Sequence, residues 1–193
     1  TRNLSAAEIV DQLCRMRELL PAGRRVTNVV FMGMGEPLLN PAALHAAIRI
    51  LIHPKAFALA PRRITVSTVG VVPQLEPLLA VAPIHLALSL HASTDCVRER
   101  LVPLNRRYPL AQLLGALRDS VYVSRRRPVF FEYTLIEGVN DSLEDARRLP
   151  RLLAGLPAKL NLIPMNAHSD CEFRAPSEEQ MDRFLREVAG SGL

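Results

Sequence analysis

The sequence lacks tryptophan, has only three cysteines and contains no long apolar run. Its apolar stretches fall well short of the ~18 residues that a membrane-spanning helix needs. Cys14, Cys96 and Cys171 are far apart, and neither their odd number nor their spacing indicates a disulfide framework or a metal site within the chain. Aromatic residues make up only 5%, so a surface that stacks single-stranded bases is not expected.

The basic side chains are almost all arginine, and the net charge is +5. They gather in short clusters, at residues 24–25, 62–63, 98–107, 125–127 and 147–151. Such clusters would attract a polyanion, but a solvated basic surface explains them equally well. With 193 residues, 49% of them hydrophobic, we expect residues 1–193 to form a single domain. The first residues show neither an initiator methionine nor a signal sequence, so we expect a cytoplasmic protein and an excerpt of a longer one.

Hydrophobic periodicity predicts alternating helices and strands. Helix starts are expected at the capping box Ser5–Glu8, at Asn40-Pro41, after Pro73, at Leu110, and at the caps Ser142 and Ser177. Between the helices are five short apolar runs, at residues 29–32, 64–69, 84–90, 129–136 and 160–164. Several runs are nearly continuous in apolar residues, which is typical of parallel strands covered on both faces. The order predicts an α/β fold with right-handed crossovers.

Small or polar residues follow the predicted strands at their C-terminal ends. In chain order they are Gly35-Glu36, residues 67–70, Ser89-Leu90-His91, Asn140-Asp141 and Asn166. We interpret Asn140-Asp141 as a turn leading to the Ser142 cap. Because the carboxyl ends of parallel strands converge on one rim, the other residues predict a binding site there.

The chemistry of this rim suits a zwitterionic, hydroxyl-bearing small molecule, with an acid that accepts from an ammonium group. Glu36 could instead be an acid near a helix start, but Asn40 is expected to supply that cap. Ser67 and Ser89 could equally bond to local backbone groups. His91 is a better ligand candidate than the other histidines, which we take as structural or solvated: His45, His53, His85 and His168. No nucleophile–base pair is apparent.

Six segments, in this order, resemble the radical S-adenosylmethionine (SAM) RNA methyltransferases of the RlmN type. They are residues 2–10, 31–40, 64–70, 88–92, 132–141 and 161–166. The resemblance implies a partial (β/α)6 TIM-like barrel of the radical SAM type that lacks its first strand. It also implies methylation of adenine C2 in 23S rRNA and tRNA through a methylcysteine intermediate.

The same resemblance implies site residues and cofactors. Gly35 and Glu36 would contact the methionine end of SAM, with Glu36 holding the amino group. Ser67 and the Ser89-Leu90-His91 segment would line the cofactor, and Asn166 would close the site. The family's [4Fe–4S] cluster is bound by a CxxxCxxC motif upstream of the segment at residues 2–5. The methyl-carrying cysteine follows residue 193, and an RNA-binding domain precedes the core.

None of the three cysteines of this chain falls in either family motif, so no catalytic residue is assigned. We therefore expect a catalytically incomplete core fragment of a family whose members act as monomers. The absence of the first strand predicts an exposed apolar edge at residues 29–32, and hence self-association. Three alternatives remain open: an adenine-C8 rRNA methyltransferase, a non-catalytic SAM- or RNA-binding remnant, and a phosphate-binding barrel, which no glycine-rich loop supports.

Overall fold

The computed structural model describes residues 2–32, 35–166 and 172–190. Its elements are α1 (Ala6–Glu18), β1 (Val29–Phe31), α2 (Pro41–Ile52), β2 (Ile64–Thr68), α3 (Val72–Val81), β3 (His85–Ser89), α4 (Asp95–Leu101), α5 (Leu110–Asp119), β4 (Val129–Leu135), α6 (Leu143–Leu152), β5 (Ala158–Pro164) and α7 (Glu178–Ala189). Short 3-10 helices are η1 (Pro37–Leu39), η2 (Pro61–Arg63) and η3 (Pro103–Arg106). Each predicted strand is present, with ends within about two residues of the prediction, which is the precision of such boundaries.

The strands form one sheet in the order β1-β2-β3-β4-β5. Val29 of β1 lies opposite Ile64 of β2, and Val129 of β4 lies opposite Ala158 of β5, both in parallel pairs. Strands and helices alternate along the chain, so the predicted α/β class with parallel pairing is confirmed.

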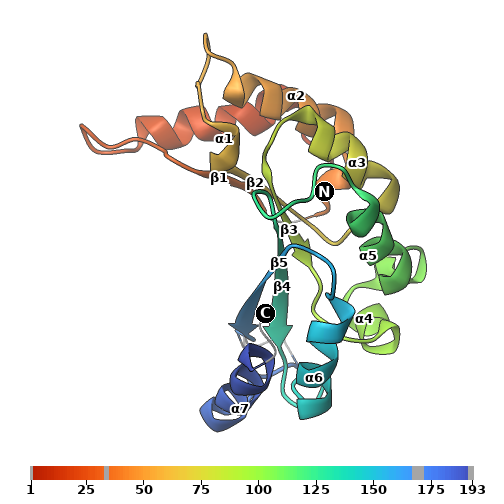
Figure 1. Cartoon of the computed structure of the whole chain (residues 1–193). Helices are drawn as coiled ribbons and strands as arrows, with labels where there is room; N and C mark the ends of the chain where they lie inside the picture. The colour runs from red at the N-terminus through yellow and green to blue at the C-terminus, as the bar shows by residue number, and fades with distance from the viewer. Residues whose placement is uncertain (1, 33–34, 167–171, 191–193) are drawn as a thin grey trace. The chain divides into compact units, whose positions relative to one another are not determined.

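The chain divides into two compact units, Thr1–Ala87 and Leu88–Leu193. In the first unit α2 packs against α1 and α3, and its apolar face supplies the buried residues Leu44, Ala47, Ile48 and Leu51. In the second unit α6 and α7 pack side by side (Figure 1), and buried side chains include Leu113, Leu117 and Phe184. The expected single domain stays a prediction. No helix in the described part of the chain is long and apolar enough to cross a membrane.

The helix starts follow the predicted caps with one exception. Ser5 and Glu8 form both bonds of a capping box, and the hydroxyls of Ser142 and Ser177 each accept from a first-turn amide. Asn40 precedes α2, but its side chain makes no cap bond; it donates to the Leu4 carbonyl at 2.7 Å instead. The expectation that the Asn40 side chain caps α2 is therefore wrong.

One helix, α4, is absent from the sequence prediction. Thr94 caps it by accepting from the amide of Val97. Its buried residue is Arg98, which is only 1% exposed. Because a charged residue occupies the buried face, hydrophobic periodicity did not reveal this helix.

Candidate functional site

Glu36 joins the chain segments that follow β1 and β2. Its carboxylate accepts from Thr68 Oγ1 at 2.7 Å, the Val69 amide at 2.8 Å and the Leu38 amide at 2.9 Å. The Leu38 bond makes Glu36 the N-cap of η1, which agrees with the alternative that Glu36 is an acid near a helix start. A carboxylate has about four lone-pair sites. The carboxylate of Glu36 therefore keeps room for one further donor, such as an ammonium group.

Gly35 has a backbone conformation that other residues rarely adopt. Its φ is +124°, and among the described residues, its chain neighbours aside, no atom lies within 4 Å of a Cβ built there. The described residues thus leave space beside its exposed backbone, as close approach of a ligand requires. On β2, Ser67 is buried with 8% exposure, whereas Thr68 is the hydroxyl residue that bonds to Glu36. The sequence did not single out Thr68.

In the second unit, the segment Ser89-Leu90-His91 turns away from β3 beside β4. The Leu90 and His91 amides both donate to the Glu132 carbonyl, at 2.9 and 3.2 Å. The Ser89 hydroxyl lies 3.5 Å from the Glu132 carboxylate. Leu90 is buried, whereas Ser89 and His91 are half-buried. The segment therefore presents two polar side chains that remain partly accessible.

The imidazole of His91 is neutral, with its proton on Nε2. The Thr134 amide donates to Nδ1 at 3.1 Å. A backbone amide can only donate, so Nδ1 carries no proton and the hydrogen bond assigns the tautomer. Burial, and secondarily the positive charge of Arg98, lower the pKa of His91 from 6.5 to about 4. At neutral pH the ring therefore presents Nε2–H as a donor.

Asn166 lies just beyond the carboxyl end of β5 and is exposed. The preceding residue, Met165, extends the pairing of β5 with β4 by donating from its amide to the Leu135 carbonyl at 3.0 Å. Asn166 thus stands at a strand end, as the sequence predicts. His168 and Cys171 lie outside the described residues. A role of Asn166 in a site stays a prediction.

Two buried polar residues near His91 were missed as site components. Arg98 donates to the carbonyls of Ser89 and Leu90, and Asn140, with 0% exposure, donates to the carbonyl of His91. The predicted turn at Asn140 exists, but its side chain reaches a segment 49 residues away in sequence. No local pattern signals such contacts.

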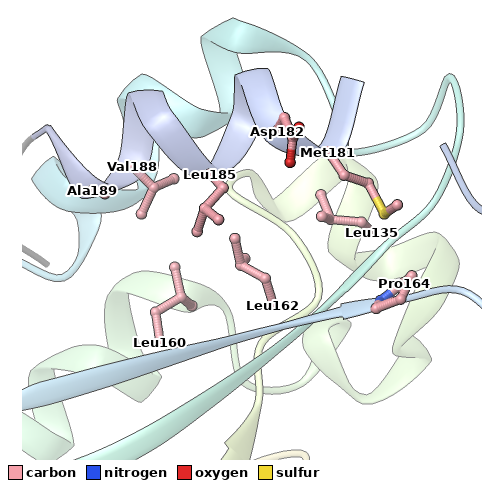
Figure 2. Close-up of a pocket in the computed structure, with 9 residues that line it drawn as sticks. All are labelled: Leu135, Leu160, Leu162, Pro164, Met181, Asp182, Leu185, Val188 and Ala189. Atoms are coloured by element: carbon pink, nitrogen blue, oxygen red, sulfur yellow. The ribbon is translucent and has the colours of Figure 1, made fainter. Parts of the chain in front are cut away.

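Two cavities among the described residues lie away from these strand ends. One of about 300 Å³ is lined mainly by apolar side chains of β5 and α7, including Leu160, Leu162 and Leu185 (Figure 2). Another of about 260 Å³ lies among Arg100, Glu137 and Arg174. Neither is lined by a predicted site residue. The polar contacts at the strand ends within each unit, rather than cavity size, therefore define the candidate residues.

The described residues do not fit an iron–sulfur cluster. Within residues 2–32, 35–166 and 172–190, no group of three or more His, Cys, Asp or Glu side chains could hold a metal ion. Cys14 is half-buried and Cys96 is exposed, and both are free thiols. A cluster of this type needs several thiolates at one point, so we derive no reaction step through one.

Comparison with known proteins defines the class of this chain. The family model of the radical SAM superfamily matches residues 1–149, and the chain belongs to that superfamily. It is 50% identical over 186 residues to the dual-specificity RNA methyltransferase RlmN of Geobacter sulfurreducens, covering 96% of this chain and 50% of that protein. The RlmN protein of Methylorubrum populi is 49% identical over 204 residues, with 99% and 48% covered. The chain thus spans about half the length of the curated relatives it matches.

Solved structures confirm the fold class. A radical SAM methyltransferase from Sphaerobacter thermophilus matches with a TM-score of 0.91 and 46% identity, covering 100% of this chain and 57% of that one. A domain of pyruvate-formate lyase-activating enzyme from Bacteroides vulgatus has a TM-score of 0.62 at 22% identity, covering 87% of this chain and 96% of that one. The second likeness shows the fold alone. Both agree with the α/β fold of the radical SAM type that the sequence predicts.

Proposed function

We propose that this chain is the SAM-binding core of a radical SAM methyltransferase that acts on C2 of adenine in 23S rRNA and tRNA. The observation that carries this proposal is the sequence identity of about 50% between this chain and RlmN proteins, which extends over nearly the full length of this chain. The same relatives favour C2 methylation over the adenine-C8 alternative.

In this proposal the strand ends hold SAM. The methionine ammonium donates to the carboxylate of Glu36, whose remaining lone pairs and open neighbour Gly35 suit it. The rest of the SAM molecule contacts the other predicted site residues, which are Ser67, Ser89, Leu90, His91 and Asn166. When bound, SAM would supply the methyl group, and the chain would orient it. The described residues contain no motif for the [4Fe–4S] cluster of the family, so no role toward that cluster is proposed for them.

RNA is the proposed partner, bound in the cytoplasm, with exposed arginines contacting phosphates. Arg125 and Arg126 lie exposed in the turn before β4. Other arginines pair with acids of the chain, as Arg147 does with Glu187 at 2.8 Å. The arginine clusters are therefore unequal, and exposed arginines such as those at residues 125–126 are better candidates for a phosphate contact than those that pair with acids.

Titration of SAM into wild type and Glu36→Gln tests the site. The substitution keeps the size of the side chain but removes the charge that attracts the ammonium. We expect binding at least roughly tenfold weaker, since a charged hydrogen bond contributes about 1.5–3 kcal/mol. Isothermal titration calorimetry measures the affinity.

The control is Glu178→Gln, the same change in the first turn of α7, which is expected to leave affinity unchanged. A SAM analogue without the amino group separates the ammonium contact from general damage. It should bind equally to wild type and Glu36→Gln. Equal binding of SAM itself to both proteins would show that Glu36 does not hold the amino group.

A further inference from the structure

The backbone of Ser89-Leu90-His91 is held by hydrogen bonds from three directions. β4 accepts from the amides of Leu90 and His91 through the Glu132 carbonyl. Arg98 Nη2 donates to the Ser89 carbonyl at 2.9 Å, and its Nε donates to the Leu90 carbonyl at 3.0 Å. Asn140 Nδ2 donates to the His91 carbonyl at 2.7 Å. Side chains therefore bond to all three carbonyls of this short segment.

His91 needs such support because its φ is +56°, in the left-handed region that non-glycine residues seldom occupy. This conformation turns the imidazole back toward β4, where Nδ1 accepts from the Thr134 amide. If the backbone relaxed to an extended conformation, that bond would be lost. The tautomer of His91 thus depends on the backbone conformation of the segment.

Arg98 is suited to this task because its guanidinium has several donors in a fixed plane. It is 1% exposed, and Nη1 donates to Asn105 Oδ1 at 2.9 Å. Asn105 Nδ2 in turn donates to Asp95 Oδ1 at 2.8 Å, which fixes the amide orientation. The two carbonyl bonds of Arg98 are thereby held in place by a buried network rooted in α4 and η3.

Asn140 is anchored as firmly. Its Nδ2 also donates to the Thr134 carbonyl at 2.7 Å, and its Oδ1 accepts from the Ile136 amide at 2.7 Å. The Tyr133 hydroxyl donates to the Asn140 carbonyl at 2.7 Å. The side-chain amide of Asn140 therefore connects the end of β4 to His91, with Nδ2 donating two hydrogen bonds and Oδ1 accepting one.

We propose that Arg98 and Asn140 are positioning residues that hold the Ser89-Leu90-His91 segment in its left-handed turn, so that His91 presents Nε2–H to an acceptor atom of the bound cofactor. The inference rests on the proposed function for the identity of that cofactor. A carboxylate, hydroxyl or ring-nitrogen acceptor of SAM would meet the donor. The Nε2–H tautomer of His91 is set by hydrogen bonds within the chain and does not depend on a bound ligand.

The test combines nuclear magnetic resonance with SAM titration. The full chain labelled with ¹⁵N-histidine is recorded without ligand, because long-range ¹H–¹⁵N correlations distinguish protonated Nε2 from protonated Nδ1. Wild type is expected to show His91 as a single neutral Nε2–H tautomer. Arg98→Lys and Asn140→Ser, which remove part of these donors, are expected to show mixed tautomers and SAM binding weakened roughly tenfold.

Leu117→Ala is the control for general destabilisation, since Leu117 is buried in α5. It should lower the unfolding temperature without changing the His91 resonances or SAM affinity. A wild-type Nδ1–H tautomer would overturn the proposal, even if the variants do not fold. Unchanged His91 resonances and SAM affinity in both positioning variants would also overturn it. So would a change of the His91 resonances and a loss of SAM affinity in Leu117→Ala as large as those in the positioning variants.

The two proposals can fail separately. If wild type does not bind SAM but the His91 resonances change in both variants and not in the control, the positioning role stands. The proposed function then fails instead. If wild type binds SAM and both positioning variants bind it equally well with unchanged His91 resonances, the positioning role fails and the proposed function stands alone.

Discussion

At the scale of single residues, polar side chains connect strand ends that are far apart in sequence. Glu36 bonds to the end of β2, 32 and 33 residues away, and Asn140 bonds to His91 across 49 residues. Each forms several hydrogen bonds in a sparsely solvated setting, where an unbonded partner would be costly. The hydrogen bonds of these residues therefore hold the strand ends at which the candidate site residues lie.

The lowered pKa of His91 predicts that stability depends on pH. Its pKa falls from 6.5 to about 4 on folding, so between these values the unfolded chain binds the extra proton. The free energy of unfolding should therefore decrease as pH falls from about 6.5 toward 4. The loss reaches at most about 3 kcal/mol and levels off below that window. Urea denaturation at a series of pH values measures it.

His91→Asn is the matched variant for this measurement. Asparagine tolerates the left-handed conformation and does not titrate. The difference in slope between wild type and His91→Asn isolates the histidine from carboxylates that also titrate as the pH falls. Identical slopes from about pH 4 to 6.5 would contradict a buried neutral His91.

At the scale of elements, β1 is a short strand at an end of the sheet. It has three residues and lies at one end of the strand order. Val30 is 52% exposed and Met32, directly after the strand, is 62% exposed. An end strand with apolar side chains can pair with another chain. The exposed edge thus agrees with the sequence, whereas self-association stays a prediction.

Sedimentation velocity over a range of concentrations tests self-association. The chain is expected to shift to larger species as concentration rises, and Val30→Lys is expected to reduce that shift because a charged end strand disfavours pairing. Leu185→Lys, on α7 and 53% exposed, controls for added charge alone. A wild type that stays monomeric at high concentration would show that the edge does not drive association.

At the scale of the whole molecule, the chain has two compact units of similar length. The unit boundary falls within β3, between Ala87 and Leu88. A break inside a strand differs from the exposed linker that usually separates domains. That residues 1–193 fold as one domain stays a prediction.

The cooperativity of unfolding tests whether residues 1–193 fold as one domain. We expect a single urea transition in which core amides of both units lose hydrogen-exchange protection together, as in small single domains. Suitable probes are the amides of Ile48 on α2 and Leu113 on α5, since both residues are fully buried and each belongs to a different unit. Protection lost at clearly different urea concentrations would mean two independently folding units.

The sequence by itself determined the order of the strands and of every α-helix except α4. It also determined the caps at Ser5, Ser142 and Ser177 and the strand-end positions of the candidate site. Periodicity and capping act over a few residues, so a local pattern contains them. The family resemblance extended this to a radical SAM core, which the comparisons support.

Only the tertiary structure decided which polar groups meet. It placed Thr68 against Glu36, made Glu36 the cap of η1, left α2 without a side-chain cap from Asn40, and buried Arg98 beneath the turn after β3. These bonds form between segments whose separation depends on the packing of the sheet and helices. A local sequence pattern specifies a donor or an acceptor, but only the folded chain selects its partner.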